Sequence, residues 1–349
     1  MPRAPWAMRN RRSQTEERAE PEYRMHWLQI MELVSSSYLP LTFWFFPRLA
    51  VQAAGIDAPW AVVGTILMGV LIALLHGWLC HLTRGISGAD MAALAFGRWP
   101  GKMVNALYTV TYFGFTGLSV FYFVTLLRPF YTNTPRWALI AALMLVAWYG
   151  ASCGVETIAR VATVIHLLAG AMILIASGIT MAESDWYWRP TRPVHAAAIF
   201  HGTYELLPLY LGFSLYLMLN PYFDHVRHRT ILYPLASVAE ASLAVAVAFV
   251  AVAARFGLAG TQLLTDPISA MIQMIRLEGW LIERVGIFAI LVTVAFTVLF
   301  TSNHLWALSA LIARTLDRPE TDFGRFVAPV TAVVAAVAIL MPNELVAEA

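Results

Sequence analysis

The sequence predicts an all-α polytopic membrane protein, and three observations support this prediction. Of the 349 residues, 59% are hydrophobic and 13% are charged, whereas soluble proteins average roughly 45–50% apolar and about 25% charged residues. Seven stretches of at least 18 residues contain no Asp, Glu, Lys or Arg, and two further stretches are apolar apart from one or two such residues. The basic residues fall in short clusters between these stretches.

Nine spans follow from these stretches, because a helix needs roughly 20 apolar residues to cross the hydrocarbon core of a bilayer. We place them, in order, at 27–53, 58–83, 103–127, 137–155, 161–182, 206–223, 230–254, 285–313 and 326–343. Most connections are short, and none is long enough to hold a soluble domain. We therefore expect a basic N-terminal arm over 1–25 and a single transmembrane domain over 26–349.

The distribution of Arg and Lys predicts a cytosolic N-terminus. Fifteen of these residues fall in segments that this orientation puts inside and seven in segments that it puts outside, as the positive-inside rule requires. The arm has no short apolar core before a cleavage site, so we expect no cleaved signal peptide. The basic residues form no stripe, which gives no sign of a nucleic-acid partner.

The long connection 255–284 contains Thr265-Asp266-Pro267 before an apolar-rich stretch that ends at Ile275. An Asp directly before a Pro is typical of a helix start, because the carboxylate caps free N–H groups and Pro has the backbone angle of a first turn. We expect a short helix on the outer surface, either as a lid or as a plain interfacial helix.

Two spans carry helix-breaking residues. The first contains three serines at 35–37 and then Pro40, and the sixth contains Pro208 and Gly212. Broken helices five spans apart are typical of inverted-repeat transporters, in which the unwound backbone binds substrate at mid-membrane depth. The alternative is that Pro and Gly merely kink the two helices.

Ionisable residues inside a span are costly in a bilayer, so each is a candidate for function. Glu240 lies near the middle of the seventh span, and we assign it a proton or ion role. Glu205 is a second candidate, because His201 lies four residues earlier on the same helix face; a polar pair at the outer interface is the alternative. Glu32 lies in the first span, and for His166 we expect an interhelical hydrogen bond.

Arg48, at the outer end of the first span, either binds a carboxylate or extends to the membrane interface. The sequence has no GxSxG, HExxH, P-loop or Gly-rich dinucleotide motif, and its two cysteines show no metal-ligand spacing. We expect no catalytic residue, no metal and no cofactor. A membrane-embedded enzyme using His166 or His304 is the alternative from another functional class.

Short motifs follow one another in a fixed order along residues 27–343. They are Pro47–Ala50, Ala54–Trp60, Phe96–Lys102, Thr134-Pro135, Gly154–Arg160, Leu211–Phe213 and Ile282–Arg284. Together they resemble the spore germination permease family, the B-type subunits of germinant receptors, which is a branch of the amino acid–polyamine–organocation transporter superfamily.

The resemblance implies a leucine-transporter-type inverted repeat of ten helices, with a ligand pocket between helices one, three, six and eight. It implies a subunit that senses a small nutrient such as an amino acid in the inner membrane of bacterial spores, beside an A-type membrane subunit and a C-type lipoprotein. The pocket positions are Ser36, Ser37, Thr42, Tyr112, Phe113, Gly212, Phe213, Ser214, Ser302 and Asn303. An ion-coupled secondary amino-acid transporter is the alternative within the same fold.

The chain departs from the family pattern at three points. Where the family has a Gly-rich break in the first helix, this chain has Pro40-Leu41-Thr42. The acidic residue that often follows Gly-Phe in the sixth helix is Ser214 here. With nine spans countable, we expect the tenth helix of the family to be missing.

Overall fold

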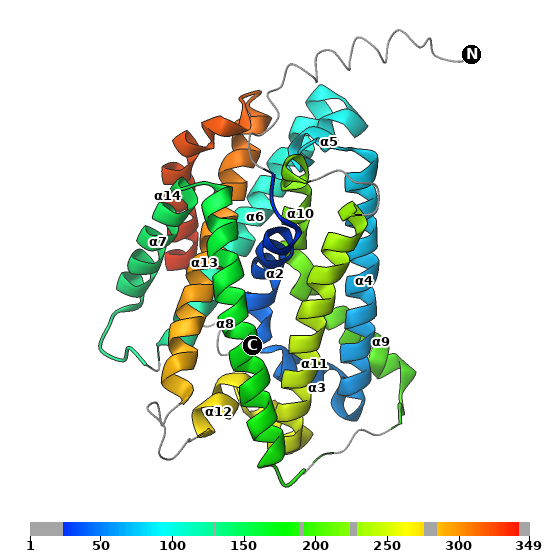
Figure 1. The fold of residues 1–349 in the computed structure, drawn as a ribbon. Helices are drawn as coiled ribbons and strands as arrows, with labels where there is room; N and C mark the ends of the chain where they lie inside the picture. Colours follow the sequence, from blue (N-terminus) through cyan, green and yellow to red (C-terminus); the bar gives the residue numbers. More distant parts are fainter. Residues whose placement is uncertain are drawn as a thin grey trace, which may run out of the picture.

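The computed structural model describes a helical bundle over residues 24–128, 130–186, 188, 192–223, 229–275 and 285–341, and at 40–42, 285 and 287 it describes the backbone alone (Figure 1). The predicted N-terminal arm lies almost entirely outside these residues.

The described residues form helices and no strand. The main helices are α2 (Trp27–Phe43), α3 (Phe46–Ala54), α4 (Ala58–Leu82), α5 (Gly88–Phe96), α6 (Arg98–Leu127), α7 (Arg136–Ser152), α8 (Val155–Ala182), α9 (Ala196–Glu205), α10 (Leu215–Met218), α11 (Arg229–Leu263), α12 (Pro267–Met274), α13 (Val285–Thr315) and α14 (Gly324–Leu340). The 3-10 helices are η1 (Gly55–Asp57), η2 (Leu207–Ser214), η3 (Asn220–Tyr222) and η4 (Glu320–Phe323).

Six helical segments of the described chain are long and apolar enough to cross a membrane, and α7 is a shorter apolar helix. The prediction of an all-α polytopic membrane protein is therefore confirmed. The exact number of nine spans stays a prediction, because the first and sixth predicted spans are each divided into shorter helices.

Small residues let the helices pack closely, as α4 illustrates. Its Ala73 and Gly77 are buried, and a Cβ added to Gly77 would lie 2.9 Å from the Cα of Ile231 on α11. On another face of α4, Leu67 and Leu75 are 64% and 54% exposed. Membrane helices associate through such close packing of small residues while large apolar side chains face lipid, so α4 has one side for the bundle and one for the bilayer.

The helix α2 lies within the bundle and packs against α6, α8, α11, α13 and η2 (Figure 1). It stays helical through Phe43, and the chain turns at Trp44 and Phe45 before α3 begins with Pro47 in its first turn. The predicted break at Ser35–Pro40 is thus placed too early along the chain. Pro47 favours the new helix start because its fixed φ suits a first helical turn.

The sixth predicted span is irregular around the predicted residues. The α9 helix ends at Glu205, and the 3-10 helix η2 begins with Pro208 in its first turn and contains Gly212. This segment begins at Ala196, ten residues before the predicted start at 206. The predicted start lies too far along the chain because Glu205 interrupts the stretch without charged residues. In the structure the Glu205 side chain is 51% exposed, so the helix contains it without burying its charge.

The two ends of the bundle differ. At the end that carries α5, Met25 N–H donates to the carbonyl of Tyr222 at 3.1 Å, and the Tyr222 hydroxyl donates to Glu320 at 2.7 Å. Arg314 joins Glu320 to Asp90, with both ion pairs at 3.3 Å. These contacts tie together segments far apart in the sequence, and we call this the α5 end.

The opposite end carries α3, α9 and α12 (Figure 1), and we call it the α12 end. The Asp266 carboxylate accepts the N–H of Ser269 at 3.2 Å, and Pro267 occupies the first turn of α12. The predicted short helix with an Asp cap and a Pro start is confirmed.

Candidate functional site

The two broken segments meet where α2 crosses η2. The Ser37 hydroxyl donates to the carbonyl of Val34 at 2.6 Å and to that of Gly212 at 2.9 Å. The Tyr112 hydroxyl of α6 donates to the same Gly212 oxygen at 3.2 Å. Three residues predicted to line a pocket are therefore brought together, with Ser37 and Tyr112 both bonded to Gly212.

Asn303 of α13 contacts α2 close to this junction. Its amide donates to the carbonyl of Leu33 at 3.0 Å and to the hydroxyl of Ser36 at 3.3 Å. Ser302, its neighbour, faces elsewhere: a Cβ on Gly150 of α7 would lie 2.6 Å from the Ser302 Oγ. The structure therefore joins Ser36 and Asn303 and directs Ser302 at α7.

The remaining predicted pocket residues are spread around the junction. Phe213 is fully buried and packs against the ring of Tyr38 with centroids 5.4 Å apart. Ser214 is hydrogen-bonded to the Tyr108 hydroxyl of α6, and Phe113 is partly buried against the core. The side chain of Thr42 lies outside the described part of the chain.

A cavity of about 540 Å³ lies at the α12 end, beside the α2–α3 turn. Its wall is formed by the turn itself, by α6, by η2 and by α12. Most of this wall is apolar and includes Phe45, Phe115, Leu118, Tyr122, Leu126 and Leu211. Small-molecule sites are typically apolar hollows of roughly 300–1,000 Å³ with a few polar groups, and this cavity has that size and character.

Two ionisable residues line the cavity: Arg48 of α3, and Asp266, which directly precedes α12. The Nε of Arg48 is buried and has no hydrogen-bond partner among the described residues. Burial raises the pKa of Asp266 to about 7, against the opposing effect of its hydrogen bonds with Ser269. At neutral pH, Arg48 is therefore the stronger charge facing a molecule in the cavity, which suits an anionic group.

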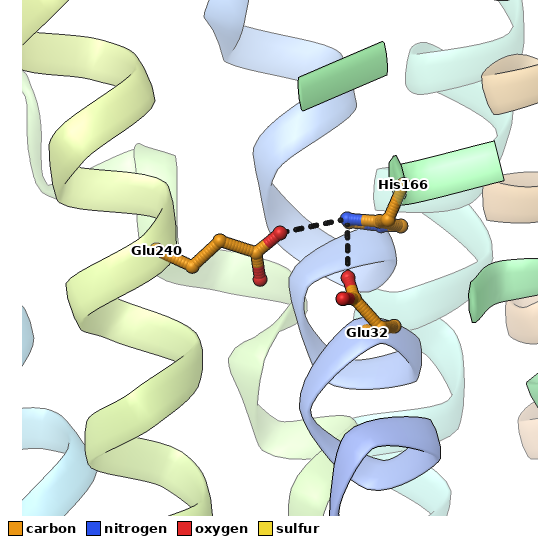
Figure 2. A group of neighbouring side chains, drawn as sticks. All are labelled: Glu32, His166 and Glu240. Carbon is orange, nitrogen blue, oxygen red and sulfur yellow. Dashed lines mark hydrogen bonds and ion pairs between the residues drawn. The ribbon is translucent and has the colours of Figure 1, made fainter. Parts of the chain in front are cut away.

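Glu32, His166 and Glu240 form a second polar centre, which we call the triad. They come from α2, α8 and α11, and Figure 2 shows both carboxylates directed at one imidazole nitrogen. The Nδ1 of His166 lies 2.8 Å from Glu32 Oε2 and 3.3 Å from Glu240 Oε1. The side chains of His166 and Glu32 are 2% and 9% exposed, and that of Glu240 is 31% exposed.

Hydroxyl groups extend the triad along α2. Ser35 donates to Glu240 Oε2 at 2.9 Å and lies 2.9 Å from the hydroxyl of Ser237. The Tyr38 hydroxyl donates to the carbonyl of Ser237 at 3.0 Å. The triad is thus connected to the same helix whose Ser37 contacts η2.

Glu205 lies away from the triad. Its carboxylate is 3.8 Å from His201 Nε2, as the shared helix face predicted, and both side chains are more than half exposed. The interhelical contact expected for His166 is also present, but with two partners. Sequence reasoning singled out Glu240 and named Glu32 and His166 without joining the three, because no sequence spacing links residues on three different helices.

Two solved structures that superimpose on this chain are membrane transporters. A Na⁺-coupled sialic acid symporter in a substrate-bound, outward-open state superimposes with a TM-score of 0.65 and 14% identity, covering 92% of this chain and 74% of that chain. Mhp1, a nucleobase-cation-symport-1 family transporter in a closed conformation with bromovinylhydantoin bound, gives 0.59 and 14%, covering 95% and 75%. The protein is an integral membrane protein with the leucine-transporter-type fold, the class to which the fold and cavity point.

The family model for spore germination proteins matches residues 24–344, and the chain belongs to that family. No curated protein matches the sequence. The predicted family and fold are thereby confirmed, and both the family and the structural neighbours are permease-like proteins rather than enzymes.

Proposed function

We propose that the protein is the ligand-binding membrane subunit of a nutrient germinant receptor, and that its ligand is an amino acid with an apolar side chain. The observation that carries this proposal is the cavity at the α12 end, where Arg48 lies in a largely apolar wall. A guanidinium binds a carboxylate through two parallel hydrogen bonds. The apolar side chain of the ligand would pack against Phe115 and Leu118 of α6.

The position of the cavity supports a sensing role. Its wall includes Phe45 of the α2–α3 turn and Pro208 of η2, so a ligand would contact both broken segments at once. A ligand that binds one arrangement of these segments better than another shifts the population toward it. In the proposed receptor, an A-type membrane subunit and a C-type lipoprotein detect that shift in the spore inner membrane, and the N-terminus is cytosolic.

Thermal unfolding of the purified full chain against a panel of L-amino acids tests ligand binding. A ligand at about 100 times its Kd adds roughly 2.7 kcal/mol to the free energy of unfolding. We expect apolar amino acids to raise the midpoint, Arg48→Gln to abolish the increase, and Arg160→Gln, which changes an exposed arginine paired with Glu156, to retain it. A panel without any increase, or an increase unaffected by Arg48→Gln, contradicts the proposal.

An ion-coupled secondary amino-acid transporter is the second candidate. The observation that favours it is the likeness in fold to a Na⁺-coupled symporter and to a nucleobase-cation symporter. Uptake of the bound amino acid into proteoliposomes distinguishes the two functions. Accumulation that collapses with an ion gradient supports transport, and binding without flux supports a receptor.

A further inference from the structure

The triad leaves an unusual charge in the bundle. With both carboxylates ionised and the imidazole neutral, Glu32, His166 and Glu240 carry two negative charges. The contacts that the structure gives these side chains involve one another, Ser35 and the ring of Phe296, whose centroid lies 4.7 Å from that of His166. No lysine or arginine is among these contacts. Uncompensated charge within a membrane-spanning bundle is costly, so two positive charges must come from outside the protein.

The donor set indicates which cation supplies them. Hard cations such as Na⁺, Mg²⁺ and Ca²⁺ prefer oxygen ligands, whereas the atom central to this triad is the imidazole Nδ1. A transition metal bound at Nδ1 would leave the proton on Nε2, and metal-bound histidines almost always donate that proton to an acceptor. The Nε2 of His166 is buried without a partner in the described structure.

Protons fit this geometry without placing a buried N–H donor at Nε2. Two protons held on the carboxyl groups make the triad neutral, and the imidazole then keeps its proton on Nδ1, which lies 2.8 Å from Glu32 Oε2 and is hydrogen-bonded to Glu240 Oε1 at 3.3 Å. The Nε2 is left as a bare acceptor against an aromatic ring rather than as a buried donor. Because the three groups interact closely, the protons belong to the triad as a unit.

We propose that Glu32, His166 and Glu240 form a proton-binding site that takes up two protons. The protonation state of this site controls how strongly α11 interacts with α2. The link is the Ser35 hydroxyl, which donates to the Glu240 carboxylate. Protonation weakens this charge-assisted hydrogen bond. Two residues further along α2, Ser37 contacts the backbone of η2, so the protonation state acts on the helix that meets the second broken segment.

Titratable groups face the triad from α2 and α11. On α2 they are Glu32 and, through the Ser237 carbonyl, the phenol of Tyr38; on α11 the facing group is Glu240. From α13 the contact is Phe296, which does not titrate. None of these groups lines the cavity at the α12 end, so the test of the triad is separate from the question of which nutrient binds there.

Infrared spectroscopy of the full chain in lipid nanodiscs tests the proposal, because a protonated carboxyl has a C=O band that an ionised one lacks. From about pH 5 to about pH 9, which spans the ordinary titration range of histidine, we expect part of this band to disappear in Asp266→Asn, which serves as the background for every variant because the pKa of Asp266 is itself about 7. Glu32→Gln and Glu240→Gln should each remove that titrating part. Glu156→Gln, which changes an exposed carboxyl elsewhere on α8, should leave it intact.

Two results would overturn the proposal. One is an Asp266→Asn protein whose carboxyl band does not titrate, or whose titration is unchanged when either triad substitution is added; the first of these results requires neither triad variant to fold. The other is stoichiometric binding of Zn²⁺ or Mn²⁺ to the wild type that Glu240→Gln abolishes, which would make the triad a metal site.

Discussion

The carbonyl oxygen of Ser37 lies 1.7 Å from the position that a Cβ on Gly212 would occupy. The α2 and η2 backbones therefore touch at Gly212, where no side chain fits. This contact joins the two broken segments of the fold, and the hydroxyls of Ser37 and Tyr112 both bind the Gly212 carbonyl.

Replacing Gly212 by Ala should destabilise the protein strongly. The added methyl group meets backbone atoms of Ser37, which cannot rotate away, and overpacking that shifts the backbone typically costs about 1–3 kcal/mol and occasionally more. Gly170→Ala is the matched control, because a Cβ there meets nothing within 4 Å. Thermal unfolding in detergent measures both, and equal midpoints for the two variants would disprove the close contact.

The Asn303 amide should stabilise the bundle modestly. Its hydrogen bonds to α2 are buried, and interhelical hydrogen bonds in membrane proteins contribute on average about 0.6 kcal/mol, with a maximum near about 1.7 kcal/mol. Asn303→Leu should lower the free energy of unfolding by an amount within this range. Ser302→Ala changes a side chain directed at α7, and it should leave ligand binding unchanged. Loss of binding in Ser302→Ala would show that the junction extends further around α13.

Asp266 should make stability depend on pH. Its pKa is raised to about 7, well above that of an unfolded aspartate. Between about pH 4 and pH 7 the folded protein therefore binds more protons than the unfolded chain, and the free energy of unfolding falls as the pH rises. Asp266→Asn keeps a capping side chain and should flatten this part of the profile of thermal midpoint against pH.

Asp317 provides the control for that profile. Lys102 and then Arg98 hold the pKa of Asp317 below its usual range, so its contribution to stability is present above the unfolded pKa and lost only as the pH falls through the folded value. Asp317→Asn should therefore leave the slope between about pH 5 and pH 7 unchanged. A profile that responds to Asp317→Asn and not to Asp266→Asn would reverse the assignment.

Backbone conformation at Asp317 leads to a separate prediction. Its φ is +58°, in the left-handed region that favours glycine. Its ion pairs are exposed, at 51% for Asp317 and 74% for Arg98, and such pairs contribute about 0–1 kcal/mol. Asp317→Ala should therefore lose about 1 kcal/mol more than Asp317→Gly in an unfolding titration. Equal losses would show that the charge, and not the backbone, decides stability here.

The sequence predicted the helices well because a bilayer imposes a simple length and composition on them. Predicted starts and ends agree for α4 and α13 to within two residues, and Asp266-Pro267 correctly predicted α12. The predicted breaks were less accurate. Pro40 lies in helical backbone, and the chain turns at Trp44 and Phe45, where no residue has a strong turn preference. Packing against neighbouring helices, which a single sequence does not encode locally, decides that position.

The candidate sites were predicted only in part. Polarity identified Ser36 and Asn303, which are hydrogen-bonded to each other, and Ser37, which contacts Gly212. An acidic residue within an apolar span identified Glu240. The triad could not be assembled from sequence, because His166 lies 74 residues from Glu240 and the three residues are on three different helices. Arg48 was named as a residue that could bind a carboxylate, but the cavity around it was not predicted, because most of its wall consists of ordinary apolar side chains.

The most direct test of the proposed function is to find where an amino acid binds. A leucine analogue carrying a photoreactive diazirine would be illuminated with the purified protein, and the labelled peptides identified by mass spectrometry. We expect label on the α6 residues Phe115 to Leu126 and on the segment containing Leu211, removed by excess leucine and absent in Arg48→Gln. Competable labelling that leaves these segments untouched, or that persists in Arg48→Gln, would contradict the account.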